Sequence, residues 1–493
     1  MMESTSQNKK SNLPVVVNTN WSIISRILLT LAIGGIAGLL VREMGVFALL
    51  IFPCIAVVLA AILQPDIGVM IFLFVTYLQL SNVLIVFHGL PSIAQPLAAL
   101  LIVIIAMRII FHREWPYNWN KTAMVVGLYV LAIFVSMYAA GNRDAALTAF
   151  VGFFKDILGG VLVFFLIRKP SSFRAAIWTL IVAGLLTGSI SVFQHLTGTF
   201  SNSYWGFGGW AAQVSGDVTR ERSTGPYSNP NAYAQVLITI IPLALERLWH
   251  ERKTFLRLVA ALSLIMCVLT VTFTYSRGGF LSMLVAVGFF FAMFRPRILP
   301  LFLTVGIVVA VLQFLPAGYL NRISTVVQLT SSNQSLVADP SFRGRMSENS
   351  AAIGMFLDHP LLGVGVGNYP VNYQDYAREI GLEARREART PASLYLEILS
   401  EQGVIGIVTF LLFLLYLFVN GFRAIQRFSD NGLIEESFLM KALIASVLGY
   451  LVAAYVKNSA YSNVFWALLG VMLGAIHLSY AQISKKWILG GPG

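Results

Sequence analysis

The sequence predicts an all-α polytopic membrane protein with a large, mainly helical loop domain on one side of the bilayer. Of 493 residues, 57% are hydrophobic and only 11% are charged, and the mean hydropathy is +0.76. Soluble domains carry roughly 25% charged residues, so a soluble fold could not bury this much apolar surface. The apolar residues also occur in runs of about 20, the length of a membrane-crossing helix. We expect about 12–14 transmembrane helices.

Apolar runs of this length lie at 22–41, 46–63, 67–88, 92–111, 122–140, 146–166, 174–197, 231–248, 256–274, 278–294, 298–316, 403–422, 438–456 and 462–481. The run at 146–166 is the weakest, because Lys155 and Asp156 interrupt it. The first 20 residues are polar, and the run after them exceeds the 7–15 apolar residues of a signal peptide. We therefore expect residues 1–20 to remain as a cytoplasmic tail.

Basic residues orient the spans. With the N-terminus in the cytoplasm, the inside segments carry most of the Lys and Arg, whereas the short outside loops carry few. Arg143 and Lys457 are the main exceptions. This pattern follows the positive-inside rule and accounts for most of the net charge of +12. No nucleic-acid partner is therefore expected, and both termini are predicted to be cytoplasmic.

The topology divides the chain into five parts. We expect a cytoplasmic tail at 1–20, transmembrane helices at 21–316 with a shorter outside loop at 198–230, and a large outside loop domain at 317–402. Transmembrane helices at 403–482 and a cytoplasmic tail at 483–493 are expected to follow, and we expect the last four residues, Gly490-Gly491-Pro492-Gly493, to be an engineered remnant. A connection as long as 317–402 usually carries function, so we expect the chemistry there. Both cysteines lie in apolar runs and no histidines cluster at metal-ligand spacing, so no metal or other cofactor is predicted.

Two arginines lie at the outside ends of predicted spans. Arg222 precedes Asn229-Pro230-Asn231, which is typical of a capped helix start. Such a start favours anions, although an ordinary capped span with a snorkelling arginine also fits. Ser276-Arg277-Gly278-Gly279 joins two further spans. Its glycines allow close backbone approach, and an arginine fork binds phosphate oxygens. Beside Arg222, this motif indicates an anion site.

The larger loop holds further candidates. Arg345 precedes a predicted helix that runs to Leu357, and His359 begins a segment with alternating glycines, Gly363, Gly365 and Gly367. The glycine spacing does not fit a dinucleotide fingerprint, which favours a tight turn that packs the loop on the membrane domain. His359 is either catalytic or part of this turn.

Glu397 and Glu401 are four residues apart and share a helix face. Either they pair with Arg385, Arg386 or Arg389, or one of them acts as a base.

Taken together, these motifs resemble the bacterial O-antigen ligase and polymerase superfamily. The resemblance covers about 200–420 and rests on Arg222, Gly225 and Asn229-Pro230-Asn231, on Ser276-Arg277-Gly278-Gly279, on His359-Pro360-Leu361-Leu362-Gly363-Val364-Gly365, and on the segment from Leu394 to Gly406. It implies a metal-independent glycosyltransferase of the bacterial inner membrane whose loops are periplasmic. Its donor would be an undecaprenyl diphosphate-linked glycan, and its acceptor the lipid A core or a carrier-linked glycan. Arg222 and Arg277, with Arg345, Asn229 and Asn231, fall where the family would hold the diphosphate.

One position departs from the family pattern. Family ligases carry a histidine, thought to be the base, immediately before the helix that starts at Leu394, and here that position is Ala392. Alanine cannot take a proton. Three explanations fit: an engineered replacement of histidine, a natural polymerase-like member that uses Glu397 or His359 as base, or loss of activity. The first is slightly favoured.

Two other functions compete with glycosyl transfer. A transporter of a small anion or solute would place ionisable groups near the bilayer midplane, whereas here the arginine-rich motifs gather at one face. A scaffold for an export complex would have no anion site at all. Binding of a diphosphate lipid that depends on Arg222 or Arg277 would separate the enzyme from both.

Overall fold

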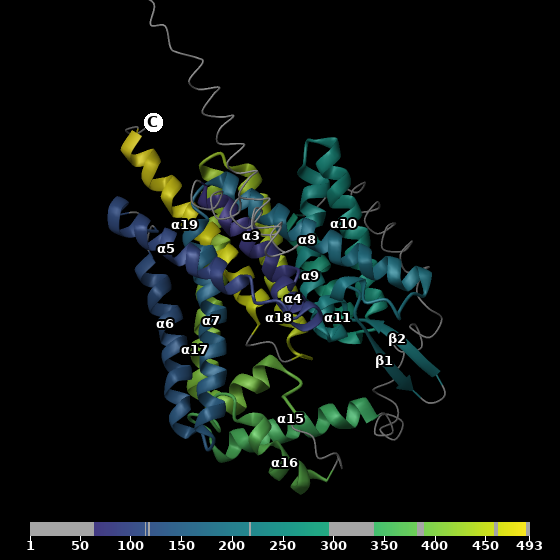
Figure 1. The fold of residues 1–493 in the computed structure, drawn as a ribbon. Helices are drawn as coiled ribbons and strands as arrows, with labels where there is room; N and C mark the ends of the chain where they lie inside the picture. Colours follow the sequence, from purple (N-terminus) through teal and green to yellow (C-terminus); the bar gives the residue numbers. More distant parts are fainter. Residues whose placement is uncertain are drawn as a thin grey trace, which may run out of the picture. The chain divides into compact units, whose positions relative to one another are not determined.

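Helices account for almost all of the structure (Figure 1). The computed structural model describes residues 64–113, 115–116, 119–215, 218–294, 340–381, 389–457 and 462–489, all within the unit that begins at Gln64. Ten described helices are long and apolar enough to cross a membrane: α5 (Ala94–His112), α6 (Trp119–Ser136), α7 (Arg143–Leu166), α8 (Pro170–Thr197), α9 (Pro230–His250), α10 (Thr254–Phe273), α11 (Arg277–Phe294), α17 (Leu394–Asp430), α18 (Ile434–Ala453) and α19 (Asn463–Leu489). An eleventh span is formed if α3 (Pro65–Tyr77) and α4 (Leu80–His88), bent by 52°, count as one.

The predicted spans agree with these helices. Eleven of the predicted runs fall on described residues, and each coincides with a helix or, at 67–88, with the bent pair α3 and α4. The doubtful run at 146–166 is α7, which extends back to Arg143. The runs at 22–41, 46–63 and 298–316 lie outside the described residues. An all-helical, multi-pass membrane protein is therefore confirmed for the part of the chain that the structure describes.

Three helices are the most enclosed of the spans. In α9, α18 and α19, 83%, 78% and 89% of the apolar stretch is buried, against 17% in α5 and 28% in α6. α9 packs on α10 and α18, while α19 packs on α7. Residues at the ends of α9 and α18 are consequently held by the best-packed part of the molecule.

Ion pairs join three helices at one end. Arg174, near the start of α8, contacts Glu435 at 2.9 Å and Glu436 at 3.1 Å, both at the start of α18. Arg247, near the end of α9, is only 1% exposed and pairs with Glu246 and Glu435. We call this the Arg174 end. The end of α8, the start of α9 and the end of α18 lie at the opposite end, which we call the Arg222 end.

A β-hairpin interrupts the connection between α8 and α9. It consists of β1 (Trp210–Ser215) and β2 (Val218–Ser223), which pair antiparallel with Ala211 opposite Arg222. Short 3-10 turns flank it at Tyr204–Gly206 (η3) and Gly225–Tyr227 (η4). From the sequence we predicted a loop at 198–230 but no strands. The hairpin matters because it brings Arg222 to the start of α9.

The described part of 317–402 is helical. α15 (Pro340–Asp358) and α16 (Tyr369–Ile380) share a small core made of Ala351, Ala352, Met355, Val364, Tyr369, Tyr373 and Ala377. Two hydrogen bonds support it: the Tyr369 hydroxyl donates to the Glu348 carbonyl at 2.7 Å, and the hydroxyls of Ser347 and Tyr373 lie 3.0 Å apart. These two helices hold the side chains of the candidate site that come from this segment.

Candidate anion-binding site at the Arg222 end

Arg222 connects three elements. Its Nε donates to the backbone carbonyl of Thr274, just after α10, at 2.7 Å, and its Nη2 donates to Oδ1 of Asn231 at 3.1 Å. The side chain is half-buried. A guanidinium held in two directions has little freedom, so its charge is fixed beside the start of α9.

The start of α9 is capped as the sequence predicts. Oδ1 of Asn229 accepts hydrogen bonds from the backbone N–H groups of Asn231 at 2.9 Å and Ala232 at 3.2 Å, and Pro230 occupies the first helical position. The carboxamide oxygen of Asn229 is thus used within the protein, and that of Asn231 holds Arg222. Both asparagines position neighbouring groups at the positive end of a well-buried helix.

Arg277 is the first residue of α11 and is half-buried. The preceding Ser276 caps the helix, since its Oγ accepts from the N–H of Gly279 at 3.1 Å. A Cβ atom at Gly278 would lie 2.2 Å from Cγ2 of Val456, and one at Gly279 would lie 2.8 Å from Cβ of Ala234 in α9. The expectation of close backbone approach is confirmed: the two glycines press the Arg277 turn against α9 and against the segment after α18.

A charged cluster lies next to this turn. Arg389 and Glu348 form an ion pair of 2.8 Å, with side chains 16% and 15% exposed. Burial raises the pKa of Glu348, while the charges of Arg389, Arg345 and Lys457 oppose the rise. Burial likewise lowers the pKa of Lys457, which is opposed by the carboxylates of Glu397 and Glu348. Three cations and two carboxylates therefore interact here, which leaves one positive charge in excess.

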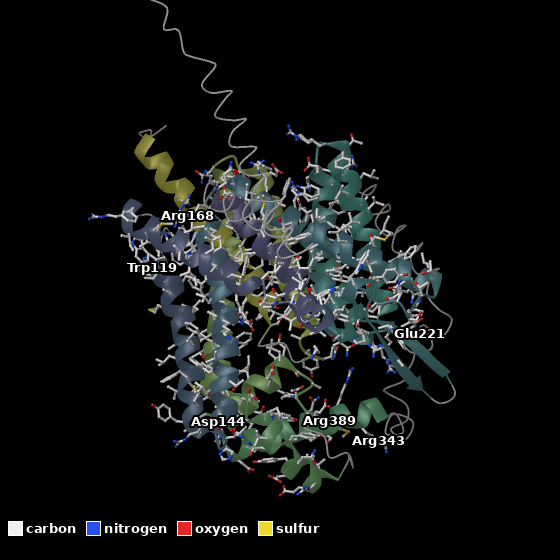
Figure 2. All side chains as sticks on the ribbon, viewed as in Figure 1. Trp119, Asp144, Arg168, Glu221, Arg343 and Arg389 are labelled. Carbon is white, nitrogen blue, oxygen red and sulfur yellow. The ribbon has the colours of Figure 1, made fainter. Side chains whose placement is uncertain are left out.

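The cluster and the Arg277 turn are neighbours, because Lys457 directly follows Val456, the residue that contacts Gly278. Arg222 is joined to the same turn through the carbonyl of Thr274, three residues before Arg277. The predicted residues Arg222, Arg277 and Arg345 are thus brought to one end of the helices. Figure 2 shows Arg343 and Arg389 at the end away from Arg168, with Glu221 on the hairpin.

Ala392 lies just before α17, which begins at Leu394 with Ser393 as its N-cap. The N–H of Leu394 donates to the carbonyl of Ala454, after α18, at 2.9 Å, and the Tyr395 hydroxyl donates to the carbonyl of Leu451 at 2.9 Å. The start of α17 is therefore tied to the end of α18. Ala392 itself is half-buried and lies beside the segment that leads to Lys457.

The glycine-rich segment after α15 is a turn that packs on α17. The N–H of Val364 donates to the carbonyl of Ser400 at 2.8 Å, and that of Val404 donates to Pro360 at 2.8 Å. Between them α17 breaks at Gly403, whose φ is +64° and ψ is −159°. A Cβ at Gly403 would lie 2.4 Å from the backbone of Leu361. The packing interpretation of these glycines is confirmed.

His359 and Glu401 both accept hydrogen bonds from backbone N–H groups of this turn. His359 is exposed, and its carbonyl accepts from the N–H of Gly363 at 2.9 Å. Glu401 is buried, and its Oε1 accepts from the N–H of Tyr369 at 3.2 Å. Of the arginines predicted to pair with Glu397 and Glu401, Arg389 forms an ion pair with Glu348, and Arg385 and Arg386 lie outside the described residues. Glu397 is buried and interacts with Lys457, so it belongs to the charged cluster.

Three members of the cluster were not among the predicted site residues: Lys457, Glu348 and Arg389. Lys457 had a signal in the sequence, because it is one of two basic exceptions in the short outside loops. Nothing in the sequence pairs Glu348 with Arg389 across 41 positions. Among the described residues, no three His, Cys, Asp or Glu side chains gather as metal ligands would.

One comparison with known proteins gives a family match. Residues 261–411 match the family model described as O-antigen ligase, Wzy_C. An O-antigen ligase domain is present. The match includes Arg277, Arg345, His359, Ala392 and Glu397, whereas Arg222 and the start of α9 precede it. No curated protein matches the chain. The O-antigen ligase family implies glycan transfer of the ligase or polymerase type, and lipid-linked glycans as its substrates.

Proposed function

We propose that this protein transfers a glycan from an undecaprenyl diphosphate-linked donor to a sugar hydroxyl at the periplasmic face of the bacterial inner membrane. The acceptor is the lipid A core if the protein is a ligase, or a carrier-linked glycan if it is a polymerase. Attack of the hydroxyl opposite the leaving diphosphate would invert the anomeric centre. The Arg222 end then faces the periplasm and both termini face the cytoplasm.

The observation that carries this proposal is the convergence of cations on the start of α9. Arg222 is fixed there by Thr274 and Asn231, and Arg277 is pressed against α9 by its glycines. The leaving group of the reaction is a diphosphate anion, so cations and a helix N-terminus placed around it stabilise charge that develops in the transition state. Arg345 and Lys457 extend this positive region toward α17. Side chains alone, without a metal ion, can therefore supply the electrostatic stabilisation.

Among the candidate bases we favour Glu397 over His359 for the chain as it stands. Glu397 is buried in the first turn of α17, five residues from Ala392, and interacts with Lys457. His359 is exposed and closes the glycine-rich turn through its backbone. A residue that acts as general base must reach the acceptor hydroxyl, and the first turn of α17 directly follows position 392, where the family resemblance places the base.

Transport of a small anion is the alternative. A transporter needs ionisable groups near the middle of the spans. Here Lys155 and Asp156 lie near the middle of a span, in α7, whereas the arginines and Lys457 described above lie at the helix ends. The enzyme proposal requires a one-sided site, which agrees with the placement of Arg222, Arg277 and Lys457.

Donor binding tests the proposal without relying on turnover. Purified protein would be titrated with an undecaprenyl diphosphate-linked glycan, and compared with Arg222→Gln, Arg277→Gln and Arg423→Gln, an exposed cation of α17 toward its Asp430 end. Because a charge-assisted hydrogen bond contributes about 1.5–3 kcal/mol, the first two changes should weaken binding about ten- to hundred-fold, while Arg423→Gln should not. Equal binding by all four proteins would refute the proposal, and binding of a small anion instead would favour transport.

A further inference from the structure

A second charged site lies at the Arg174 end, away from the site described above. A pocket of about 620 Å³ is bounded by the start of α8, the α9–α10 connection and the start of α18. Its lining includes Arg174, Trp178, His250, Arg252, Lys253 and Phe438. Basic pockets between helix ends are typical sites for anionic lipid headgroups.

The carboxylates of the pocket are already engaged. Oε1 of Glu251 accepts from the backbone N–H groups of Arg252 at 3.0 Å and Lys253 at 3.1 Å. Glu435 forms ion pairs with both Arg174 and Arg247. In contrast, the side chains of Arg252 and Lys253 are exposed. The pocket therefore presents positive charge to a ligand.

The adjacent start of α10 adds to this potential. α10 begins at Thr254, and its N-cap residue, Lys253, makes no side-chain capping bond. A helix start carries a partial positive charge from its unpaired N–H groups. An anion in the pocket would thus meet two exposed cations and a positive helix end.

An apolar groove begins where this pocket ends. It has a volume of about 500 Å³ and is lined by Met70 and Phe74 of α3 and by Trp178 and Val182 of α8, among others. Trp178 lines both cavities. The Ser172 hydroxyl donates to Asp66 at 2.8 Å, so α3 and α8 start at the same end and run side by side. On α8 the groove is lined from Ala175 to Val182, which at 1.5 Å per residue is about 10 Å.

We propose that these two cavities together hold an anionic phospholipid, with its phosphate in the Arg252–Lys253 pocket and an acyl chain in the groove between α3 and α8. Free phosphate would use only the pocket and leave the apolar groove without a role. A zwitterionic lipid would bring a positive group to a pocket whose carboxylates already have partners. Trp178 stands at the boundary between polar and apolar lining, where tryptophan is favoured at membrane interfaces.

Native mass spectrometry of the purified protein with added phosphatidylglycerol, phosphatidylcholine or inorganic phosphate tests this proposal. The double variant Arg252→Gln, Lys253→Gln should bind phosphatidylglycerol about thirty-fold more weakly, as expected for the loss of two membrane-proximal cations. The matched control is Lys121→Gln, Arg423→Gln, which removes one lysine and one arginine that are exposed elsewhere. This control should bind like the unaltered protein.

Three outcomes would overturn the proposal. Equal affinity for phosphatidylcholine would remove the role of charge, and equal loss in both double variants would show that binding is not local. Displacement of the lipid by millimolar inorganic phosphate would show that the site binds phosphate alone and that the groove does not bind an acyl chain. A second variant, Ala175→Phe, narrows the groove alone and should weaken lipid binding while the Arg252–Lys253 pair stays intact. None of these results depends on glycan transfer, so they stand apart from the test of the donor site.

Discussion

Arg389 and Glu348 form a 2.8 Å ion pair that joins the segment before α17 to α15. Both side chains are largely covered by protein, so water screens the pair only weakly. Arg345 and Lys457 add two further positive charges around the same carboxylate. The pair thus anchors α15 next to Lys457, which also interacts with Glu397 in the first turn of α17.

The pH dependence of stability should report on Glu348. Its pKa is raised in the folded protein above the ordinary 4.5, mainly by burial. A raised pKa means that the folded state binds the proton more tightly, so this contribution to stability is complete below pH 4.5 and is lost as pH rises through the raised pKa. Glu348→Gln should flatten the dependence of the unfolding free energy on pH just above 4.5, measured by denaturant unfolding. An unchanged slope would contradict the assignment.

Ala392→His should restore or strengthen catalysis. The change places an imidazole beside the start of α17, where the family has its base, and general-base catalysis contributes about 10²–10⁴ in rate. Transfer from an undecaprenyl diphosphate-linked donor measures the effect, with Ala392→Asn as a control for size and polarity. If the unaltered chain and Ala392→His are equally fast, residue 392 does not carry the base.

Glu397→Gln distinguishes the explanations for Ala392. If Glu397 is the working base of the unaltered chain, its removal should lower the transfer rate about 10²–10⁴-fold while donor affinity stays within a few-fold. In the Ala392→His background the same change should then matter much less. If Glu397→Gln weakens donor binding but leaves the transfer rate unchanged, Glu397 only positions Lys457 and is not the base.

Gly403→Ala should be far more destabilising than Gly381→Ala. Both glycines have φ near +65°, but a Cβ at Gly381 meets nothing within 4 Å, whereas one at Gly403 meets the backbone of Leu361 at 2.4 Å. Left-handed backbone costs alanine about 1 kcal/mol, so Gly381→Ala should cost about that. Gly403→Ala, with a conformation open almost only to glycine, should cost at least about 3 kcal/mol. Thermal unfolding in micelles compares the two, and equal losses would show that the break is not tightly packed.

Arg247→Met should be among the most damaging single changes at the Arg174 end. Arg247 is 1% exposed and donates through Nη2 to Oε1 of Glu246, itself 0% exposed, at 2.9 Å. Removing one partner leaves a buried charge without its counter-ion, which costs about 3–5 kcal/mol. The double change Arg247→Met, Glu246→Leu removes both charges and should recover most of the loss in unfolding free energy. If the double change does not recover the unfolding free energy, the loss comes from packing and not from the unpaired charge.

Hydropathy and local chemistry predicted much of this molecule. Each apolar run on described residues is helical, with the run at 67–88 divided into α3 and α4, because a chain in lipid must satisfy its backbone internally. The cap at Asn229-Pro230 and the close approach at Gly278 followed from residue type alone. Each of these features is determined within a few residues of the chain.

Long-range pairings could not be predicted in the same way. Lys457 and Glu397 interact across 60 positions, whereas the break of α17 at Gly403 falls where the predicted span at 403–422 begins. The hairpin had a local signal, Gly216-Asp217 between two six-residue segments. A two-residue turn pattern is a weak indication of strands in a sequence whose other segments predict helices. Which carboxylate meets which cation depends on how α15, α17 and α18 pack.

The break at Gly403 bears on any exchange of parts between related proteins. Where α17 resumes, the N–H groups of Val404 and Ile405 donate to the carbonyls of Pro360 and Leu361 rather than to their own helix. The glycine-rich turn thus supplies the acceptors that α17 itself lacks at its break. A chimera that grafts a foreign loop without the matching residues 400–405 would leave these donors without acceptors, so the turn and the start of α17 must be transplanted as one module.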